Sequence, residues 1–180
     1  RPPNIEGKGE VSMRTLVKNS LRMRPNRIVV GEVRGEEVID MLQAMNTGHD
    51  GSLTTVHANN PRDALGRLEN LMSMSGVDMP ARTQRQQICS AIQIIVQANR
   101  MSDGTRKITS IAELSGMEGE VITMQEIFKY DRETVNAEGK VIGLFSATGI
   151  RPKIADHLKT SGIELSDNIF VPANNKIDNR

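Results

Sequence analysis

Two polar residues stand directly after short apolar runs: Glu32 follows "RIVVG" and His57 follows "SLTTV". A carboxylate at the end of a buried strand is costly unless a polar partner meets it. Such an acid can orient an attacking water on a phosphate or hold Mg²⁺ through water, and an imidazole can donate to a phosphate oxygen. The structural alternative is an ion pair with Arg34 for Glu32, and a core or capping position beside a helix start for His57.

Further cationic side chains gather around the first of these runs, namely Arg22, Arg24, Arg27 and Arg34. A guanidinium group binds phosphate through its planar fork of donors, which makes this concentration a candidate phosphate surface. The alternative is a solvated basic face. His49 lies in "TGHDG", between two glycines, where a structural turn residue is the simpler interpretation.

The elements that must position these residues alternate between helix and strand. A helix is predicted from Ser12, which can cap it, to about Met23, with Leu16, Leu21 and Met23 on its apolar side. Pro25 ends this helix, because the residue before a proline disfavours helical geometry. Residues 27–33 then predict a buried strand, since a β-branched run lies between turn signals.

The alternation continues with a helix over residues 35–48, a strand over 52–58 and a helix over 60–74. Apolar side chains at helical spacing support both helices: Val38, Ile39, Met41, Leu42 and Met45 in the first, and Leu65, Leu68, Leu71 and Met72 in the second. This order predicts an α/β fold with a parallel sheet covered by helices. Ligands bind at the carboxyl ends of such strands, so Glu32 and His57 are expected to share one site.

The second half of the chain changes to β structure. After a helix over residues 79–89, a β-hairpin from residue 91 to 114 turns at Asp103-Gly104, and two further strands cover residues 121–131 and 140–147. A short helix is expected near residues 152–161. The polar end, residues 172–180, is expected to be frayed.

Composition excludes several classes of protein. Among 180 residues, aromatic side chains make up 2% and the net charge is +1, which argues against base-stacking platforms and against a basic nucleic-acid binder. The single cysteine, Cys89, excludes an internal disulfide and is predicted to be a buried apolar side chain. No apolar run approaches the roughly 20 residues of a membrane span. Because the chain starts at Arg1, we expect a piece of a longer protein.

The stretch "LRMRPNRIVVGEVRGEEVIDMLQAMNTGHDGSLTTVHANNPRDALGRLE" resembles the Walker B block and histidine box of the traffic ATPases of bacterial type II and type IV secretion and pilus systems. Within that family, "RPPNIEGKGEVSMRTLVKNSLRMRPNRIVVGEVRG" and "GLFSATGIRP" are similar to the CpaF/TadA-type ATPase of the tight-adherence (Flp) pilus. The resemblance implies a loop over residues 1–11, part of a RecA-like P-loop NTPase core over 12–90, a β-rich part of the same domain over 91–148 and a tail over 149–180.

The resemblance also implies roles for individual residues. Glu32 matches the catalytic glutamate that polarises the hydrolytic water, and His57 matches the histidine-box residue on the γ-phosphate side of the nucleotide. His49 matches an earlier family histidine in the "TGH" turn. Arg34 matches the basic residue after the Walker B strand. No residue is expected to ligate a metal directly, since Mg²⁺ would arrive with the nucleotide near Glu32.

Three more arginines, Arg22, Arg14 and Arg24, match arginines near subunit boundaries in the family, and one of them is expected to reach a neighbour's nucleotide as an arginine finger does. The implied protein is a hexameric motor that uses ATP and Mg²⁺ and acts on inner-membrane platform proteins. It would be cytoplasmic and peripheral to the bacterial inner membrane, with no direct contact to nucleic acid.

One departure from the family is large, because the chain contains no G-x-x-x-x-G-K-[ST] phosphate loop. We therefore expect the C-terminal portion of the motor, inactive by itself, with an exposed edge where the first strand lacks a sheet neighbour. Two alternatives stay open: a non-catalytic assembly or binding module, and the ATPase of a DNA-transferring type IV secretion system.

Overall fold

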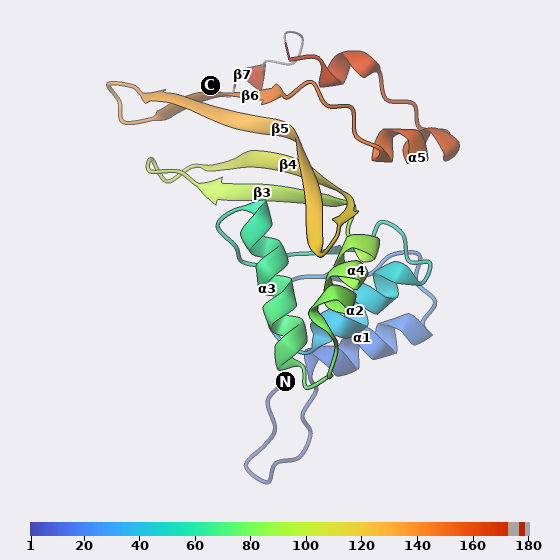
Figure 1. Cartoon of the computed structure of the whole chain (residues 1–180). Coiled ribbons are helices and arrows are strands. Elements are labelled where there is room, and N and C mark those ends of the chain that lie inside the picture. The colour runs from blue at the N-terminus through green and yellow to red at the C-terminus, as the bar shows by residue number, and fades with distance from the viewer. Residues whose placement is uncertain (173–176, 179–180) are drawn as a thin grey trace. The chain divides into compact units, whose positions relative to one another are not determined.

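The computed structural model describes residues 1–172 and 177–178. The chain divides into two compact units: Arg1–Ala58 with Arg62–Ile92, and Asn59–Pro61 with Gln93–Arg180 (Figure 1). The α/β class predicted from the sequence is confirmed, because helices alternate with a parallel strand pair in the first unit and the second unit is built on an antiparallel sheet.

The first unit carries the alternating elements. Along the chain they are α1 (Met13–Arg22), β1 (Val29–Val30), α2 (Glu37–Asn46), β2 (Leu53–Thr54), α3 (Pro61–Met74) and α4 (Ala81–Ala91). Strands β1 and β2 pair in parallel, with Val29 opposite Leu53 and Val30 opposite Thr54. Each strand is only two residues long, so the loops that follow them begin close to the paired region.

Helix α1 begins as predicted, because the Ser12 hydroxyl accepts the N–H of Thr15 at 3.1 Å. The predicted apolar side is wrong. Val17 is the buried residue of this helix, whereas Leu16 is 49% and Met23 is 79% exposed. The helix lies against α2 through charged side chains, which periodicity of apolar residues does not reveal.

The prediction of a buried strand over residues 27–33 is wrong in part. Val30 and Val33 are buried, but Val29 is 71% exposed and its partner Leu53 is 62% exposed. In the described part of the chain this sheet has two strands, with Val30 on its packed face and Val29 and Leu53 on the face open to solvent. Val29 and Leu53 lie opposite each other, so the two exposed side chains form one apolar patch on that face.

The core of the first unit is aliphatic and rich in methionine. Helix α2 packs against both α1 and α4 (Figure 1). The predicted face of α3 is confirmed, and the fully buried side chains of the unit include Val38, Met41, Leu42, Leu71, Met72 and Ile88. Cys89 is half-buried rather than buried, which corrects its prediction.

The second unit is an antiparallel sheet in the order β3-β4-β5-β6-β7. Its elements are β3 (Ile94–Arg100), β4 (Arg106–Glu118), β5 (Val121–Val135), β6 (Val141–Ala147), α5 (Ile154–Thr160), η1 (Asp167–Phe170) and β7 (Ile177–Asp178). The predicted hairpin is confirmed, and Gly104 takes the left-handed conformation that its turn requires (φ 83°). Ile177 and Asp178 pair with β6, so the predicted fraying is wrong there; residues 173–176 and 179–180 of that end lie outside the described residues.

Aromatic and buried polar side chains hold the second unit together. Phe128 stacks on Phe145 with ring centroids 5.7 Å apart and contacts Phe170 from η1. Glu113 in β4 is 3% exposed, and its carboxylate accepts the backbone N–H groups of Lys153 at 2.9 Å and Ile154 at 2.7 Å. This acid therefore fixes the start of α5 on the sheet.

None of the helices in the described residues combines the length and the apolar character that crossing a bilayer demands.

Candidate functional site

The structure brings Glu32 and His57 into direct contact. Glu32 lies two residues after β1 and His57 lies three residues after β2, and the parallel pairing of the strands delivers both to the same end. His57 Nε2 is 3.1 Å from Glu32 Oε1, and Arg34 Nη2 is 2.5 Å from Glu32 Oε2. One carboxylate therefore meets an imidazole and a guanidinium on separate oxygens, so the structural alternative of a Glu32–Arg34 pair is realised together with the contact to His57.

The three side chains of this trio, Glu32, Arg34 and His57, differ in their exposure to solvent. The side chain of Glu32 is 22% exposed, while those of Arg34 and His57 are 76% and 86% exposed. The carboxylate is thus held at the surface of the unit by its own loop, and the more exposed side chains of Arg34 and His57 contact it from the solvent side. An incoming anion can approach Arg34 and His57 without passing through packed structure.

The pKa of Glu32 is lowered from its ordinary value. The hydrogen bond from Arg34 is the largest cause, and the charges of Arg34 and His57 act in the same direction, while partial burial opposes them. The same contact raises the pKa of Arg34. Glu32 is therefore ionised at neutral pH and can accept a proton or a hydrogen bond from a water molecule.

The loop that carries Glu32 is fixed by side chains from both neighbouring elements. On one side, the Thr55 hydroxyl donates to the carbonyl of Gly31 at 2.5 Å, and Val33 N–H donates to the carbonyl of Thr55 at 3.0 Å. On the other side, Glu37 Oε1 in α2 accepts the N–H groups of the two residues that follow Val33, at 2.7 Å and 3.1 Å. The position of Glu32 therefore depends on these contacts more than on the short strand.

Sequence reasoning missed both Thr55 and Glu37. Glu37 had only the signal of an acid in the first turn of a helix, where a negative charge is favoured. In this chain it reaches Arg34, three residues before it. Thr55 had none, since a threonine in a strand is common for reasons of β propensity alone.

His49 is not part of this trio. Its Nδ1 lies 3.2 Å from the carbonyl of Ala44 at the end of α2, where the tautomer protonated at Nδ1 donates to that carbonyl. The backbone carbonyl of His49 accepts the Ser52 hydroxyl at 2.7 Å. Among the described residues, His49 has neither a hydrogen bond nor an ion pair to Glu32 or His57, so the structure gives this histidine a turn-closing role.

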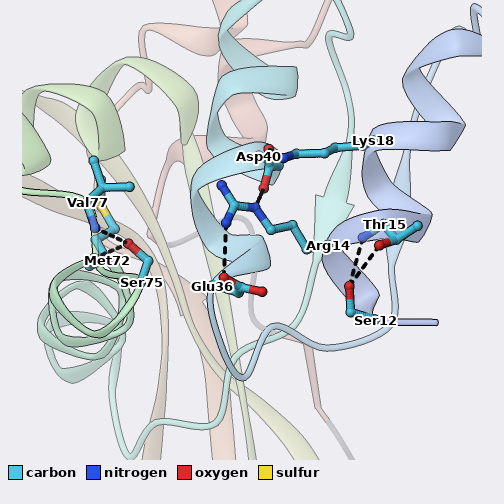
Figure 2. A network of polar contacts seen from close by, with 9 residues as sticks. All are labelled: Ser12, Arg14, Thr15, Lys18, Glu36, Asp40, Met72, Ser75 and Val77. Atoms are coloured by element: carbon cyan, nitrogen blue, oxygen red, sulfur yellow. Dashed lines mark hydrogen bonds and ion pairs between the residues drawn. The ribbon is translucent and has the colours of Figure 1, made fainter. Parts of the chain in front are cut away.

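Arg14 is engaged inside the chain (Figure 2). Its Nε lies 2.7 Å from Asp40 Oδ2 and its Nη1 lies 3.0 Å from Glu36 Oε2, while Lys18 Nζ is 3.6 Å from Asp40 Oδ1. Figure 2 shows Arg14 and Lys18 reaching from α1 toward the first turns of α2. The contact with Asp40 is the main reason that the pKa of Arg14 is raised. Arg14 would have to release two carboxylates before it could contact a neighbouring subunit.

Arg22 and Arg24 are placed differently. Arg22 is the last residue of α1, and Arg24 has a left-handed backbone conformation (φ 50°) before Pro25; both are exposed. Within residues 1–172 and 177–178, neither has an ion pair with a carboxylate. Arg27 instead packs over Gly51, since a Cβ on that glycine would lie 2.9 Å from Arg27 Nε. Two predicted arginines are therefore available to an external anion.

The donor set suits a phosphate and a water molecule better than a bound metal. The described residues contain no group of three or more His, Cys, Asp or Glu side chains that could hold a metal ion. Glu32 contacts a guanidinium and an imidazole, neither of which brings a further carboxylate to the site. A divalent cation at this place would need its remaining ligands from a phosphate group or from water, as Mg²⁺ commonly does.

Comparisons with known proteins identify the family of the chain. Residues 3–137 match the family model described as Type II/IV secretion system protein. A putative conjugal transfer protein of Mycobacterium tuberculosis is 49% identical over 121 residues, which cover 67% of this chain and 34% of that protein. The conjugal transfer protein TrbB of Rhizobium radiobacter is 37% identical over 106 residues, which cover 59% of this chain and 31% of that protein.

A solved structure supports the same relation. The chain is similar to the crystal structure of the VirB11 ATPase from the Brucella suis type IV secretion system in complex with sulphate, with a TM-score of 0.52 and 31% identity. The match covers 56% of this chain and 31% of that one. The chain spans about a third of the length of the curated relatives it matches. Since the family model covers most of its residues, this chain belongs to the Type II/IV secretion system protein family.

Proposed function

We propose that this chain is the C-terminal portion of an ATP-hydrolysing secretion motor, in which Glu32 polarises the hydrolytic water and His57 faces the γ-phosphate of the nucleotide. The observation that carries the proposal is the contact between His57 Nε2 and Glu32 Oε1, 3.1 Å, at the ends of two parallel strands. The His57 side chain is 86% exposed, so packing of the protein interior does not force it against Glu32.

The chemistry assigns a separate task to each member of the trio. Glu32, ionised because Arg34 lowers its pKa, accepts a hydrogen bond from the attacking water and increases its nucleophilicity. Arg34 and His57 offer donors to phosphate oxygens, where charge grows during transfer. The direct Glu32–His57 contact has to open for water to enter, and an arriving phosphate supplies the anion that His57 would then bind.

ATP and Mg²⁺ are the cofactors of this proposal. Mg²⁺ supplies charge neutralisation on the phosphates when it is bound with the nucleotide. The 180 residues contain no G-x-x-x-x-G-K-[ST] loop, so in the proposed motor another part of the full-length protein holds the phosphates. This chain contributes Glu32, which contacts the attacking water, the exposed donors Arg34 and His57, and the exposed Arg22 and Arg24.

The assembly we propose is a hexameric ring, cytoplasmic and peripheral to the bacterial inner membrane, that acts on membrane platform proteins. Arg22 and Arg24 are exposed and have no ion pair with a carboxylate of the described residues, which supports a role at a subunit boundary, because such a guanidinium can bind a neighbour's phosphate. Arg14, held by Asp40 and Glu36, is the weaker candidate for that role.

Two branches of the family compete for the biological task. The similarity of "GLFSATGIRP" and the N-terminal stretch to the tight-adherence branch supports Flp pilus assembly. The names of the relatives favour a second candidate, conjugal DNA transfer by a type IV system. Deleting the gene separates the two: loss of surface pili with unchanged conjugation supports the first, and loss of conjugation with unchanged pili supports the second.

The Glu32→Gln substitution tests the catalytic proposal in the full-length protein. Glutamine keeps the size of the side chain but cannot ionise, so nucleotide binding should stay near normal while turnover falls about 10²- to 10⁴-fold. Steady-state ATPase rates and nucleotide affinity are the two measurements. The control is Glu138→Gln, which removes an exposed carboxylate paired with Lys140. Unchanged turnover in Glu32→Gln would leave a non-catalytic assembly module as the better interpretation.

A further inference from the structure

The loop of residues 31–35 carries both Glu32 and Arg34, so its backbone sets the geometry of their contact. Glu37, in the first turn of α2, is 6% exposed although it bears a carboxylate. A buried charge requires strong partners, and Glu37 Oε1 has two in the N–H groups of Arg34 at 2.7 Å and Gly35 at 3.1 Å. Both donors belong to the loop and neither belongs to a regular element.

We propose that Glu37 is a positioning residue of the site: its carboxylate fixes the backbone at Arg34 and Gly35 so that the Arg34 guanidinium meets Glu32. The catalytic meaning of this assignment rests on the proposed function of Glu32, whereas the positioning itself does not. Glu37 touches neither a reacting atom nor the Glu32 carboxylate, and acts only through Arg34.

The packing around Glu37 is tight enough to transmit its position. A Cβ on Gly35 would lie 3.2 Å from Glu37 Oε2, so the loop passes directly over the carboxylate. The start of a helix is also a favourable place for a carboxylate, because the helix dipole is positive there. Loss of the carboxylate would leave two N–H groups without their acceptor, and the loop would move to find water.

The neighbouring acid Glu36 provides a contrast within the same turn of the chain. Its side chain is 50% exposed and pairs with Arg14 of α1 rather than with the loop. Substituting Glu36 removes a charge next to Glu37 but no contact to residues 31–35. The two adjacent glutamates therefore form a matched pair for experiment, one directed at the site loop and one directed away from it.

The experiment is a titration of the Glu32 carboxyl carbon by NMR in this chain, without nucleotide. In the wild type its pKa lies below the ordinary 4.5 because Arg34 donates to it. Glu37→Ala should move the Glu32 midpoint up toward 4.5, since a released loop takes Arg34 away. Glu36→Ala should leave the midpoint where it is.

Glu37→Gln separates position from charge. The amide oxygen can still accept the loop N–H groups, so the Glu32 midpoint should stay low; removing a nearby negative charge can only lower it further. Rescue by Gln and loss in Ala therefore support positioning. An unchanged midpoint in a folded Glu37→Ala chain, or an equal rise in Ala and Gln, overturns it. If circular dichroism shows that Glu37→Ala is unfolded, Glu37→Asp replaces it, because the shorter acid cannot reach both N–H groups and should raise the midpoint too.

A second arm uses the full-length protein. Glu37→Ala should lower kcat about 10- to 100-fold, the range seen when residues that orient a functional group are removed, and leave KM for ATP nearly unchanged. If Glu32→Gln has normal turnover, the proposed function fails while the titration still decides the positioning. If only the titration shows no effect, the positioning fails and the function stands.

Discussion

The two compact units differ in the interactions that fix their strands and the loops beyond them. In the first unit, β1 and β2 have two residues each, and side chains of Thr55 and Glu37 fix the loop beyond them. In the second unit, β4 and β5 run for 13 and 15 residues, and a long backbone ladder with two register shifts pairs them. The difference indicates that the chemical groups lie where few hydrogen bonds set their position, so small energies can move them.

The largest effect on stability is expected from a steric change in the second unit. A Cβ on Gly143 in β6 would lie 2.6 Å from the carbonyl oxygen of Asp131 and 2.7 Å from the Tyr130 ring. Since the first of these is a backbone atom, the strands have to separate, and Gly143→Ala should lower the free energy of unfolding by about 3 kcal/mol. Denaturant unfolding followed by circular dichroism measures the loss.

The matched control for Gly143→Ala lies in the first unit. Gly66 is an exposed interior residue of α3, and a Cβ there meets nothing within 4 Å. Because alanine has the higher helix propensity, Gly66→Ala should raise the free energy of unfolding by about 1 kcal/mol. If both alanine variants behave alike, the close approach at Gly143 does not limit stability.

The contrast between the units also explains what the sequence could predict. The hairpin at Asp103-Gly104 and the buried face of α3 were predicted correctly, because turn chemistry and apolar periodicity are local. The buried side of α1 was not. Its contact with α2 depends on Arg14 meeting Asp40, 26 residues further along the chain, and no local pattern encodes that pairing.

The candidate site, too, could be predicted only where local sequence patterns encode it. The meeting of Glu32 with His57 could be expected from two apolar runs that end in polar residues, given a parallel sheet. The role of Glu37 could not be separated from that of an ordinary first-turn acid until the loop was seen over it. The exposure of Val29 and Leu53 was missed because an apolar run looks alike whether one or both faces of its sheet are covered.

A smaller effect is expected at the charged contact between α1 and α2. Asp40→Asn keeps one acceptor for Arg14 but removes the charge that Arg14 and Lys18 share. The thermal midpoint should fall by a few degrees at low salt, and the difference from the wild type should shrink in concentrated NaCl, because salt screens the lost attraction. Glu138→Gln, at an exposed pair with Lys140, should show no such difference. A salt-independent deficit in Asp40→Asn would mean that packing, and not charge, holds α1.

The smallest effect is confined to acid and concerns the second unit. Backbone N–H of Val141, and then the hydroxyl and N–H of Thr105, donate to Asp103 and lower its pKa from 3.8 to about 2. A carboxyl with a lowered folded-state pKa contributes stability above its unfolded value, and the contribution is lost as the pH falls through the folded value. The wild type should therefore exceed Asp103→Asn in thermal midpoint at pH 5, and the gap should close between about pH 4 and pH 2. A gap that stays constant down to pH 2 would show that Asp103 links the β3–β4 turn to β6 through shape and hydrogen bonding in either protonation state.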